Sequence, residues 1–272
     1  MSVELYYGKP KPQEFPEVVD QFSVKQINSL KTSTLPLLQY WKNELKVRGF
    51  LKNLDIDYSP DQPIQLCFEY PTPVKKGKGK ASMTDLMIIG DGFKIAVEAK
   101  YKEYTHKVRN RYGEYEPIRK WYRKGKDADN RCSVLEGWFG CLKEFCNLPD
   151  DVINDPCKYL DKIGGIPYQF LHRVASACDG KPDTAYVVYQ IFYDEEAEAD
   201  KDDFVNELTA ARETLDPKEN LKIAIQTVQV RFTADDIPQD DRKKETKERA
   251  LQRIKDNELY EIVKEGWILL NR

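Results

Sequence analysis

The chain has 272 residues, of which 40% are hydrophobic and 33% are charged, and it carries a net charge of −3. This composition is typical of a globular protein with a sizeable core, and the slightly acidic balance argues against a dedicated nucleic-acid coat protein. No apolar run reaches the roughly 18 residues that a membrane-spanning helix needs, so we expect no membrane association.

Six cysteines are present, and none forms a Cys-x-x-Cys pair. The first residues show neither a basic region nor a long apolar region, so no signal peptide is expected. We therefore predict reduced thiols and a cytoplasmic location.

The N-terminal third is predicted to be mainly helical. Residues 1–16 are rich in Pro and Lys and are expected to form an irregular arm, followed by a helix within residues 17–31. A second helix should begin at Ser33 and end at Gly49, because its apolar residues recur at helical spacing: Leu37, Leu38, Trp41 and Leu45. Residues 63–70 predict a strand, and the Gly- and Lys-rich residues 75–80 predict a mobile loop or a simple exposed connection.

Residues 84–100 carry the strongest pattern in the chain. Two apolar, β-branched runs flank Asp91-Gly92, which predicts a hairpin with a two-residue type I′ turn. In the resulting register Asp85 lies opposite Glu98, and Lys100 shares the face of Glu98. The other face should be buried, because it is wholly apolar: Leu86, Ile88, Phe93, Ile95, Val97 and Ala99.

Two opposed carboxylates repel each other, and a divalent cation would remove that conflict. Mg²⁺ prefers oxygen ligands and often uses one or two carboxylates together with waters and a substrate phosphate. Asp85 and Glu98 are therefore the predicted metal ligands, and the alternative is a surface hairpin with a salt bridge between Glu98 and Lys100.

Asp85, twelve intervening residues and Glu98-Ala99-Lys100 resemble the signature of the PD-(D/E)xK nuclease superfamily. Thr84 stands where that signature has Pro. The resemblance implies an α/β restriction-endonuclease-like fold, in which a mixed central sheet is flanked by helices. It also implies a Mg²⁺ site that accepts Mn²⁺, a ligand from the carbonyl of Ala99, a catalytic role for Lys100, and DNA as the substrate.

Residues 101–131 interleave aromatic and basic side chains, as do proteins that hold nucleic-acid strands by stacking and charge. Residues 75–131 as a whole contain 16 Lys or Arg against 8 Asp or Glu. We expect a substrate-facing insertion, unless its rings pack on the core and its charges are merely solvated. The predicted nucleic-acid contacts are Lys78, Lys80, Arg109, Arg111, Lys120 and Arg123.

The remaining elements alternate between helix and strand. Helices are predicted over residues 133–146, 167–178 and 204–215, strands over 185–193 and 221–232, and a terminal helix within residues 240–272 that runs toward Trp267. Residues 147–165 should form a loop or a small subdomain. We expect one domain over residues 1–272 with its α/β core at about 33–232.

Several polar residues are candidates for accessory roles. In branches of the superfamily a Gln on the helix after the catalytic strands reaches the site, which singles out Gln169, with Arg173 and His172 on the same polar stripe. Glu44 and Glu69 are candidate additional acids. A structural or solvated role is the alternative for each of these residues.

The sequence as a whole predicts a Mg²⁺-dependent nuclease that hydrolyses phosphodiester bonds, with DNA favoured over RNA. A catalytically inactive nucleic-acid-binding module with the same fold is the alternative, and an unrelated α/β interaction protein is a third hypothesis. A homodimer, which would allow both strands to be cut, is left open.

Overall fold

The computed structural model describes residues 2–8, 11–27, 32–59, 61–101, 116–124, 126–194, 198–233, 252, 254–255 and 259–270. Its centre is a seven-stranded mixed sheet in the order β1-β2-β3-β4-β5-β6-β7. The strands are β1 (Val3–Tyr7), β2 (Ile64–Thr72), β3 (Ser82–Gly90), β4 (Phe93–Tyr101), β5 (Thr184–Tyr193), β6 (Leu221–Phe232) and β7 (Tyr260–Leu269). Strands β2, β3 and β4 are antiparallel, whereas β5 is parallel to both β4 and β6. The predicted α/β class with a mixed sheet flanked by helices is confirmed.

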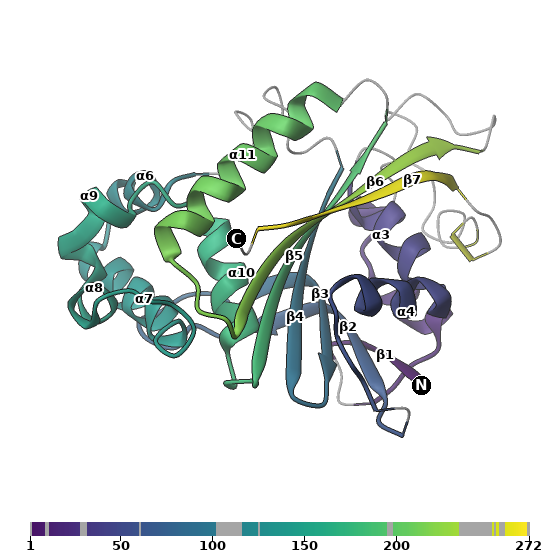
Figure 1. Cartoon of the computed structure of the whole chain (residues 1–272), viewed down its shortest axis with the longest axis horizontal. Coiled ribbons are helices and arrows are strands. Elements are labelled where there is room, and N and C mark those ends of the chain that lie inside the picture. Colours follow the sequence, from purple (N-terminus) through teal and green to yellow (C-terminus); the bar gives the residue numbers. More distant parts are fainter. Residues whose placement is uncertain are drawn as a thin grey trace.

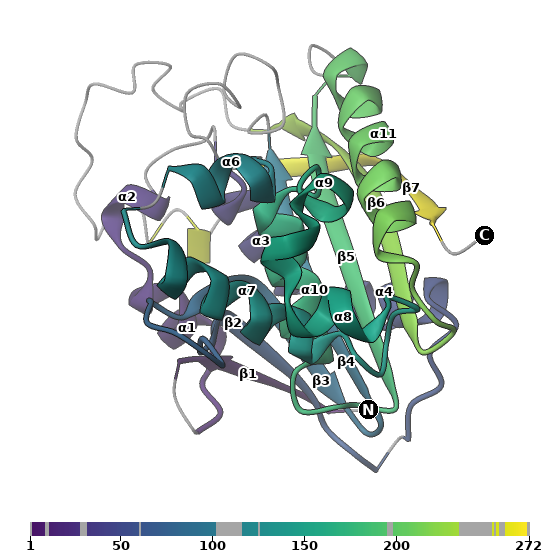
Figure 2. The same cartoon turned by 90° about the vertical axis from the view of Figure 1, so that its left-hand side faces the viewer.

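Helices cover both faces of the sheet (Figure 1). One face carries the N-terminal helices α1 (Phe15–Gln21), α2 (Val24–Ile27), α3 (Thr34–Trp41) and α4 (Glu44–Asn53). The other carries α6 (Ile118–Arg123), α7 (Ala128–Cys141), α8 (Asp150–Asn154), the 3₁₀ helix η1 (Pro156–Tyr159), α9 (Leu160–Ile163), α10 (Tyr168–Cys178) and α11 (Glu198–Leu215). Each face therefore has its own apolar core. Figure 2 shows α7 and α10 in front of the strands.

The hairpin of β3 and β4 has the predicted register. Gly90 pairs with Phe93 and Leu86 pairs with Val97, so the turn consists of Asp91 and Gly92. The predicted apolar face is buried against the N-terminal helices. The turn is not type I′, because only Gly92 of the two turn residues has a positive φ, of 74°.

The conformation of Gly92 gives a testable stability effect. A Cβ at this position would be held at a φ that L-residues disfavour and would lie 2.9 Å from Oδ2 of Asp183. We expect Gly92→Ala to lower the free energy of unfolding by roughly 1–2 kcal/mol. The matched control is Gly140→Ala, since a Cβ on Gly140 in α7 meets no atom within 4 Å. Because Ala has a higher helix propensity than Gly, Gly140→Ala should raise the free energy of unfolding by up to about 1 kcal/mol. Urea denaturation of both variants checks the two signs, and equal effects would contradict the prediction.

Three N-terminal predictions are wrong in their boundaries or type. Residues 3–7 are not an irregular arm but strand β1, which pairs in parallel with β2. The helix predicted within 17–31 is two helices, α1 and α2. The helix predicted from Ser33 to Gly49 is also two, because Asn43 accepts a hydrogen bond from the backbone N–H of Leu45 and so caps α4. Leu45, expected on the buried stripe, is exposed.

Two predictions farther along the chain are also wrong. Of the terminal helix predicted within residues 240–272, residues 252, 254 and 255 are helical, but the part that reaches Trp267 is strand β7, antiparallel to β6. Cys132 and Cys157 form a disulfide that links α7 to η1, so these two cysteines are not reduced, whereas Cys67, Cys141, Cys146 and Cys178 are free thiols. Within the described residues, no helix combines the length and apolar character required to cross a bilayer.

Candidate functional site

Asp85 and Glu98 meet where β3 and β4 run side by side. The pairing of Leu86 with Val97 places Asp85 opposite Glu98 at the next step of the ladder. Oδ2 of Asp85 accepts a hydrogen bond from the backbone N–H of Ala99 at 2.8 Å, which ties the side chain of one strand to the backbone of the other. The predicted juxtaposition of the two acids is therefore present.

Glu98 is 1% exposed and is surrounded by hydrogen-bond donors. Its Oε1 lies 2.6 Å from Nζ of Lys100 and accepts a hydrogen bond from the amide of Gln169, also at 2.6 Å. Its Oε2 accepts a hydrogen bond from Nε of Arg173. Two cations and one neutral amide thus hold a single buried carboxylate.

The two acids have pKa values shifted in opposite directions. Burial alone would raise the pKa of Glu98, but the charges of Arg173 and Lys100 outweigh it and lower that pKa. Burial, with repulsion from Glu98, raises the pKa of Asp85 well above its usual value, and Lys100 and Arg173 offset this only in part. Lys100 and Arg173 therefore stabilise the ionised form of Glu98 more effectively than that of Asp85.

Glu69 adds a third carboxylate on the neighbouring strand β2. It lies between Phe68, which pairs with Leu86, and Tyr70, which pairs with Thr84, so it is next to Asp85 on the adjacent strand, and its charge acts on Asp85. Its backbone has a positive φ of 49°, and its Oε1 accepts a hydrogen bond from the Gln26 amide of α2 at 3.0 Å. Burial, with the nearby charge of Glu98, raises the pKa of Glu69. Backbone strain of this kind is typical of functional sites.

The polar stripe of α10 faces the sheet and not the solvent. Pro167 precedes the helix and Asp179 ends it, as the sequence predicts. Arg173 and Ser176 are buried, and Nη1 of Arg173 donates a hydrogen bond to the hydroxyl of Ser82 at 3.0 Å. Gln169 and Arg173 both reach Glu98, so this helix closes the cluster from above the sheet.

His172 belongs to the same stripe but contacts aromatic rings. Its ring lies 3.9 Å from that of Tyr168 and 5.0 Å from that of Trp138, and its Nδ1 is 3.3 Å from the Ser82 hydroxyl. Burial, with the charge of Arg173, lowers the pKa of His172 to about 3. At neutral pH the ring is therefore uncharged, and a structural role accounts for its contacts.

The lowered pKa of His172 predicts acid lability. The unfolded chain takes up a proton near the ordinary pKa and the folded chain does not until about pH 3, so stability is complete above that ordinary value and is lost as the pH falls. The loss should be roughly 1.4 kcal/mol for each pH unit in this window. We expect His172→Gln to reduce the slope of the free energy of unfolding against pH by the contribution of one proton, measured between pH 7 and pH 4. If the free energy of unfolding fell equally steeply with pH in the wild type and in His172→Gln, the lowered pKa of His172 would be contradicted.

Glu44 is not part of the cluster. It is exposed at the start of α4, on the opposite face of the sheet, where it lines a separate cavity with Glu4 and Glu17. The prediction of Glu44 as an accessory acid is wrong because the break at Asn43 starts a new helix that turns this residue to the solvent.

The basic residues singled out by the sequence are only partly described. Lys78, Lys80, Lys120 and Arg123 are exposed, whereas Arg109 and Arg111 lie outside the described residues. Lys120 lies 3.8 Å from Glu116. The loop of residues 75–80 is held against α7, because the backbone of Lys78 exchanges hydrogen bonds with the Asn130 side chain at 2.6 and 3.0 Å. The prediction of a mobile loop is therefore not supported.

The aromatic residues of the predicted insertion pack inward where they are described. Tyr101 is buried, and Trp121 stacks on Tyr168 at 3.9 Å while the guanidinium of Arg131 lies 4.4 Å from its centroid. Trp121 is half-buried and packs against the apolar core on this side of the sheet. Packing on the core, the alternative to base stacking, is the arrangement found for these rings.

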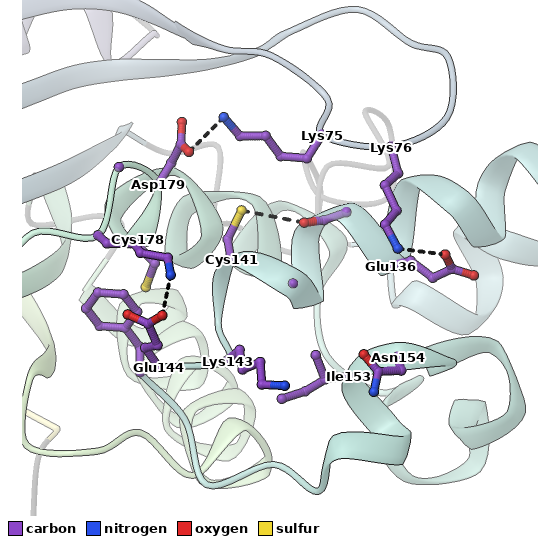
Figure 3. A pocket seen from close by; sticks show the side chains of 15 residues that line it. Lys75, Lys76, Glu136, Cys141, Lys143, Glu144, Ile153, Asn154, Cys178 and Asp179 are labelled. Carbon is purple, nitrogen blue, oxygen red and sulfur yellow. Dashed lines mark hydrogen bonds and ion pairs between the residues drawn. The ribbon is translucent and has the colours of Figure 1, made fainter.

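A cavity of about 560 Å³ lies apart from the acids, between α7, α8 and the end of α10 (Figure 3). Four lysines at its rim each pair with a carboxylate: Lys75 with Asp179, Lys76 with Glu136, Lys143 with Asp150 and Lys181 with Glu144. Because every described ammonium group there already has an acidic partner, the cavity favours no particular charge in a ligand.

The acids can be tested for their fit to a metal ion. Within the described ranges, no group of three or more His, Cys, Asp or Glu side chains is arranged to hold a metal. Mg²⁺, however, commonly uses only one or two protein carboxylates. The contacts described for Asp85 engage Oδ2 and leave Oδ1 available. Asp85 and Glu98 therefore fit a two-carboxylate Mg²⁺ site, with the carbonyl of Ala99 as a further oxygen, if Glu98 gives up one of its present donors.

Ser82 and Gln26 are contacts of the cluster that the sequence does not indicate. Ser82 lies at the start of β3 and binds Arg173, and Gln26 reaches Glu69 from a helix more than forty residues away. Neither stands in a motif, and only the tertiary fold brings them to the acids.

Comparisons with known proteins identify a family but no activity. Among curated proteins no relative matches the chain. No solved structure matches it either. A sequence model of one family matches residues 14–234, which span the sheet from the helices before β2 to the end of β6. The chain therefore belongs to the family described as Domain of unknown function (DUF6946).

Proposed function

We propose that the chain is a metal-dependent nuclease with a restriction-endonuclease-like fold that hydrolyses phosphodiester bonds in DNA. The observation that carries the proposal is the convergence of Asp85, Glu98, Lys100 and Gln169 on one point of the sheet. The first acid lies on the middle strand of an antiparallel meander, and the second acid and the Lys lie on the next strand. Helix α10 then leads to the parallel strand β5, in agreement with the order that the resemblance implies.

A divalent ion held by Asp85, Glu98 and the Ala99 carbonyl would polarise the scissile phosphate and lower the pKa of a bound water. The residues of the chain provide a fixed environment for this chemistry. Lys100, buried and 2.6 Å from Glu98, carries a positive charge that can face the charge developing on the phosphoryl group. Gln169 and the N–H of Ala99 fix the orientations of Glu98 and Asp85, so little reorganisation is needed during reaction.

Binding of the polynucleotide is assigned in this proposal to the basic residues of the sequence. Lys78, Lys80, Lys120 and Arg123 are exposed and would contact backbone phosphates, together with Arg109 and Arg111. Such contacts give affinity without sequence preference and should weaken steeply with salt. A dimer, which would allow paired cuts in a duplex, also belongs to the proposal.

One observation favours the alternative, a catalytically inactive nucleic-acid-binding module. Both oxygens of Glu98 are engaged by Lys100, Gln169 and Arg173, so the carboxylate has its charge compensated without a metal. An inactive descendant could keep this cluster for stability alone.

A cleavage screen separates the two functions. The full chain is incubated with supercoiled plasmid, linear duplex, single-stranded DNA and RNA, in Mg²⁺, Mn²⁺, Ca²⁺ or EDTA. We expect cleavage in Mg²⁺ or Mn²⁺ and none in EDTA. Lys100→Met should lower the rate by roughly 10²- to 10³-fold.

The matched control for Lys100→Met is Lys94→Met, since Lys94 is also buried on β4 but donates to the carbonyl of Asp179. It should cleave at the wild-type rate per folded molecule. Binding without cleavage under every ion would favour the inactive module, and the absence of both binding and cleavage would overturn both functions.

A further inference from the structure

Both oxygens of the Glu98 carboxylate already accept hydrogen bonds. Lys100 and Gln169 occupy Oε1, Arg173 occupies Oε2, and the residue is 1% exposed. A metal ion at the site proposed above must therefore share an oxygen of Glu98 with one of these three donors or displace that donor. The identity of that donor determines what a metal must displace.

Arg173 has a second anchor besides Glu98. Its Nη1 donates a hydrogen bond to the Ser82 hydroxyl at 3.0 Å while its Nε contacts Glu98. When the contact with Glu98 is broken, the guanidinium thus keeps a hydrogen bond. It is also the only described donor that contacts Oε2, so its withdrawal exposes a whole oxygen, whereas loss of Lys100 or Gln169 leaves Oε1 still engaged by the other.

The charge of Arg173 also makes it the donor that a metal ion would displace. A guanidinium cannot lose its proton in a protein, so its repulsion with an incoming divalent cation can be relieved only by movement. Arg173 is 5% exposed, and its charge is therefore poorly screened. Gln169 carries no charge and has no such conflict with a cation.

We propose that Arg173 is an internal counter-ion that occupies the place of the metal on Glu98 and competes with divalent cations for it. Arg173 is thus a positioning residue that sets the metal affinity of the site, and the metal-free protein is stabilised by the contact that the metal must replace. This inference rests on the proposed metal-dependent function and concerns the regulation of the same site.

Isothermal titration of the metal-free full chain with MnCl₂ and MgCl₂, without nucleic acid, tests the inference. Arg173→Gln removes the charge and keeps a hydrogen-bonding amide, and it should tighten the metal Kd by roughly tenfold. Arg173→Lys keeps the charge but loses the guanidinium that spans Glu98 and Ser82. Its metal Kd should lie between those of the wild type and Arg173→Gln. The matched control is Arg119→Gln, which changes an arginine of α6 paired with Asp161 and should leave the Kd unchanged.

A second measurement uses the wild-type protein alone. The NMR signal of the Arg173 Nε–H group, assigned by its loss in Arg173→Lys, should move on addition of Mg²⁺ with the midpoint found by calorimetry. This keeps the inference testable if Arg173→Gln fails to fold.

The outcomes separate the two proposals. Metal binding by the wild type with equal or weaker binding by the Arg173 variants overturns the inference and leaves the nuclease proposal standing. Tighter binding by the variants without any cleavage supports the inference and overturns the nuclease proposal. No metal binding by the wild type or any variant overturns both.

Discussion

Asp85→Asn should abolish metal-dependent cleavage, with a loss of at least about 10³-fold, and should at the same time stabilise the metal-free protein. Burial and repulsion from Glu98 raise the pKa of Asp85, so the ionised form destabilises the fold at every pH above the ordinary Asp pKa. An asparagine removes that charge and keeps an oxygen for the N–H of Ala99. The melting temperature at pH 7 without metal should therefore rise.

The neighbouring acid should respond with the opposite sign. Arg173 and Lys100 lower the pKa of Glu98, so its charge contributes stability above the ordinary Glu pKa that is lost as the pH falls through the lowered value. Glu98→Gln removes the carboxylate that pairs directly with two buried cations, Lys100 and Arg173, and should destabilise the fold by about 3 kcal/mol. The matched control is Glu44→Gln, an exposed acid whose change should alter the free energy of unfolding by no more than about 0.5 kcal/mol.

If Asp85→Asn instead lowered the stability of the metal-free protein, the Asp85 carboxylate would stabilise the fold, and its assignment as a metal ligand would be contradicted.

The hairpin and its acids could be predicted because their information is local. Asp91-Gly92 fixes where β3 turns into β4, and strict alternation then assigns every side chain of the hairpin to a face. The opposition of Asp85 and Glu98 follows from counting residues away from that turn. The role of Gln169 came from the resemblance, and its contact with Glu98 agrees with that expectation.

The predictions that are wrong concern segments whose structure depends on residues far away in the sequence. Ile254 lies in a helical residue pair, as the period predicts, but residues from Tyr260 onward pair with β6, and no local pattern indicates that pairing. Strand β1 is likewise defined by its pairing with β2, some sixty residues later. The polar stripe of α10 by itself predicts a solvent-facing Arg173, which is a site candidate only through the resemblance; in the structure Arg173 is buried beside Glu98 and Asp85.

A buried network of amides behind the acids is the second feature with a large expected effect. Gln190 pairs with Ala99 in the sheet and points, like Ala99, to the face opposite Glu98, where its Oε1 accepts a hydrogen bond from Nε1 of Trp41 at 2.9 Å. Its amide donates to Oε1 of Gln226 at 2.8 Å, and Gln226 donates to the hydroxyl of Tyr40 at 2.7 Å. The network joins α3 to β5 and β6, the two strands that follow β4 in the sheet.

Gln190→Leu should lower the free energy of unfolding by about 3 kcal/mol, because it leaves the Trp41 indole N–H and the Gln226 carbonyl oxygen buried without partners. The double variant Gln190→Leu with Trp41→Phe should recover part of this loss, since it removes one of the two orphaned groups. Urea denaturation with an unchanged m-value provides the measurement. Gln229→Leu, a half-buried glutamine on β6 outside the described network, is the matched control and should change stability by less than about 0.5 kcal/mol. If Gln190→Leu proved equally mild, the hydrogen bonds would be incidental, and apolar packing alone would hold α3 against the strand pair that supports Glu98.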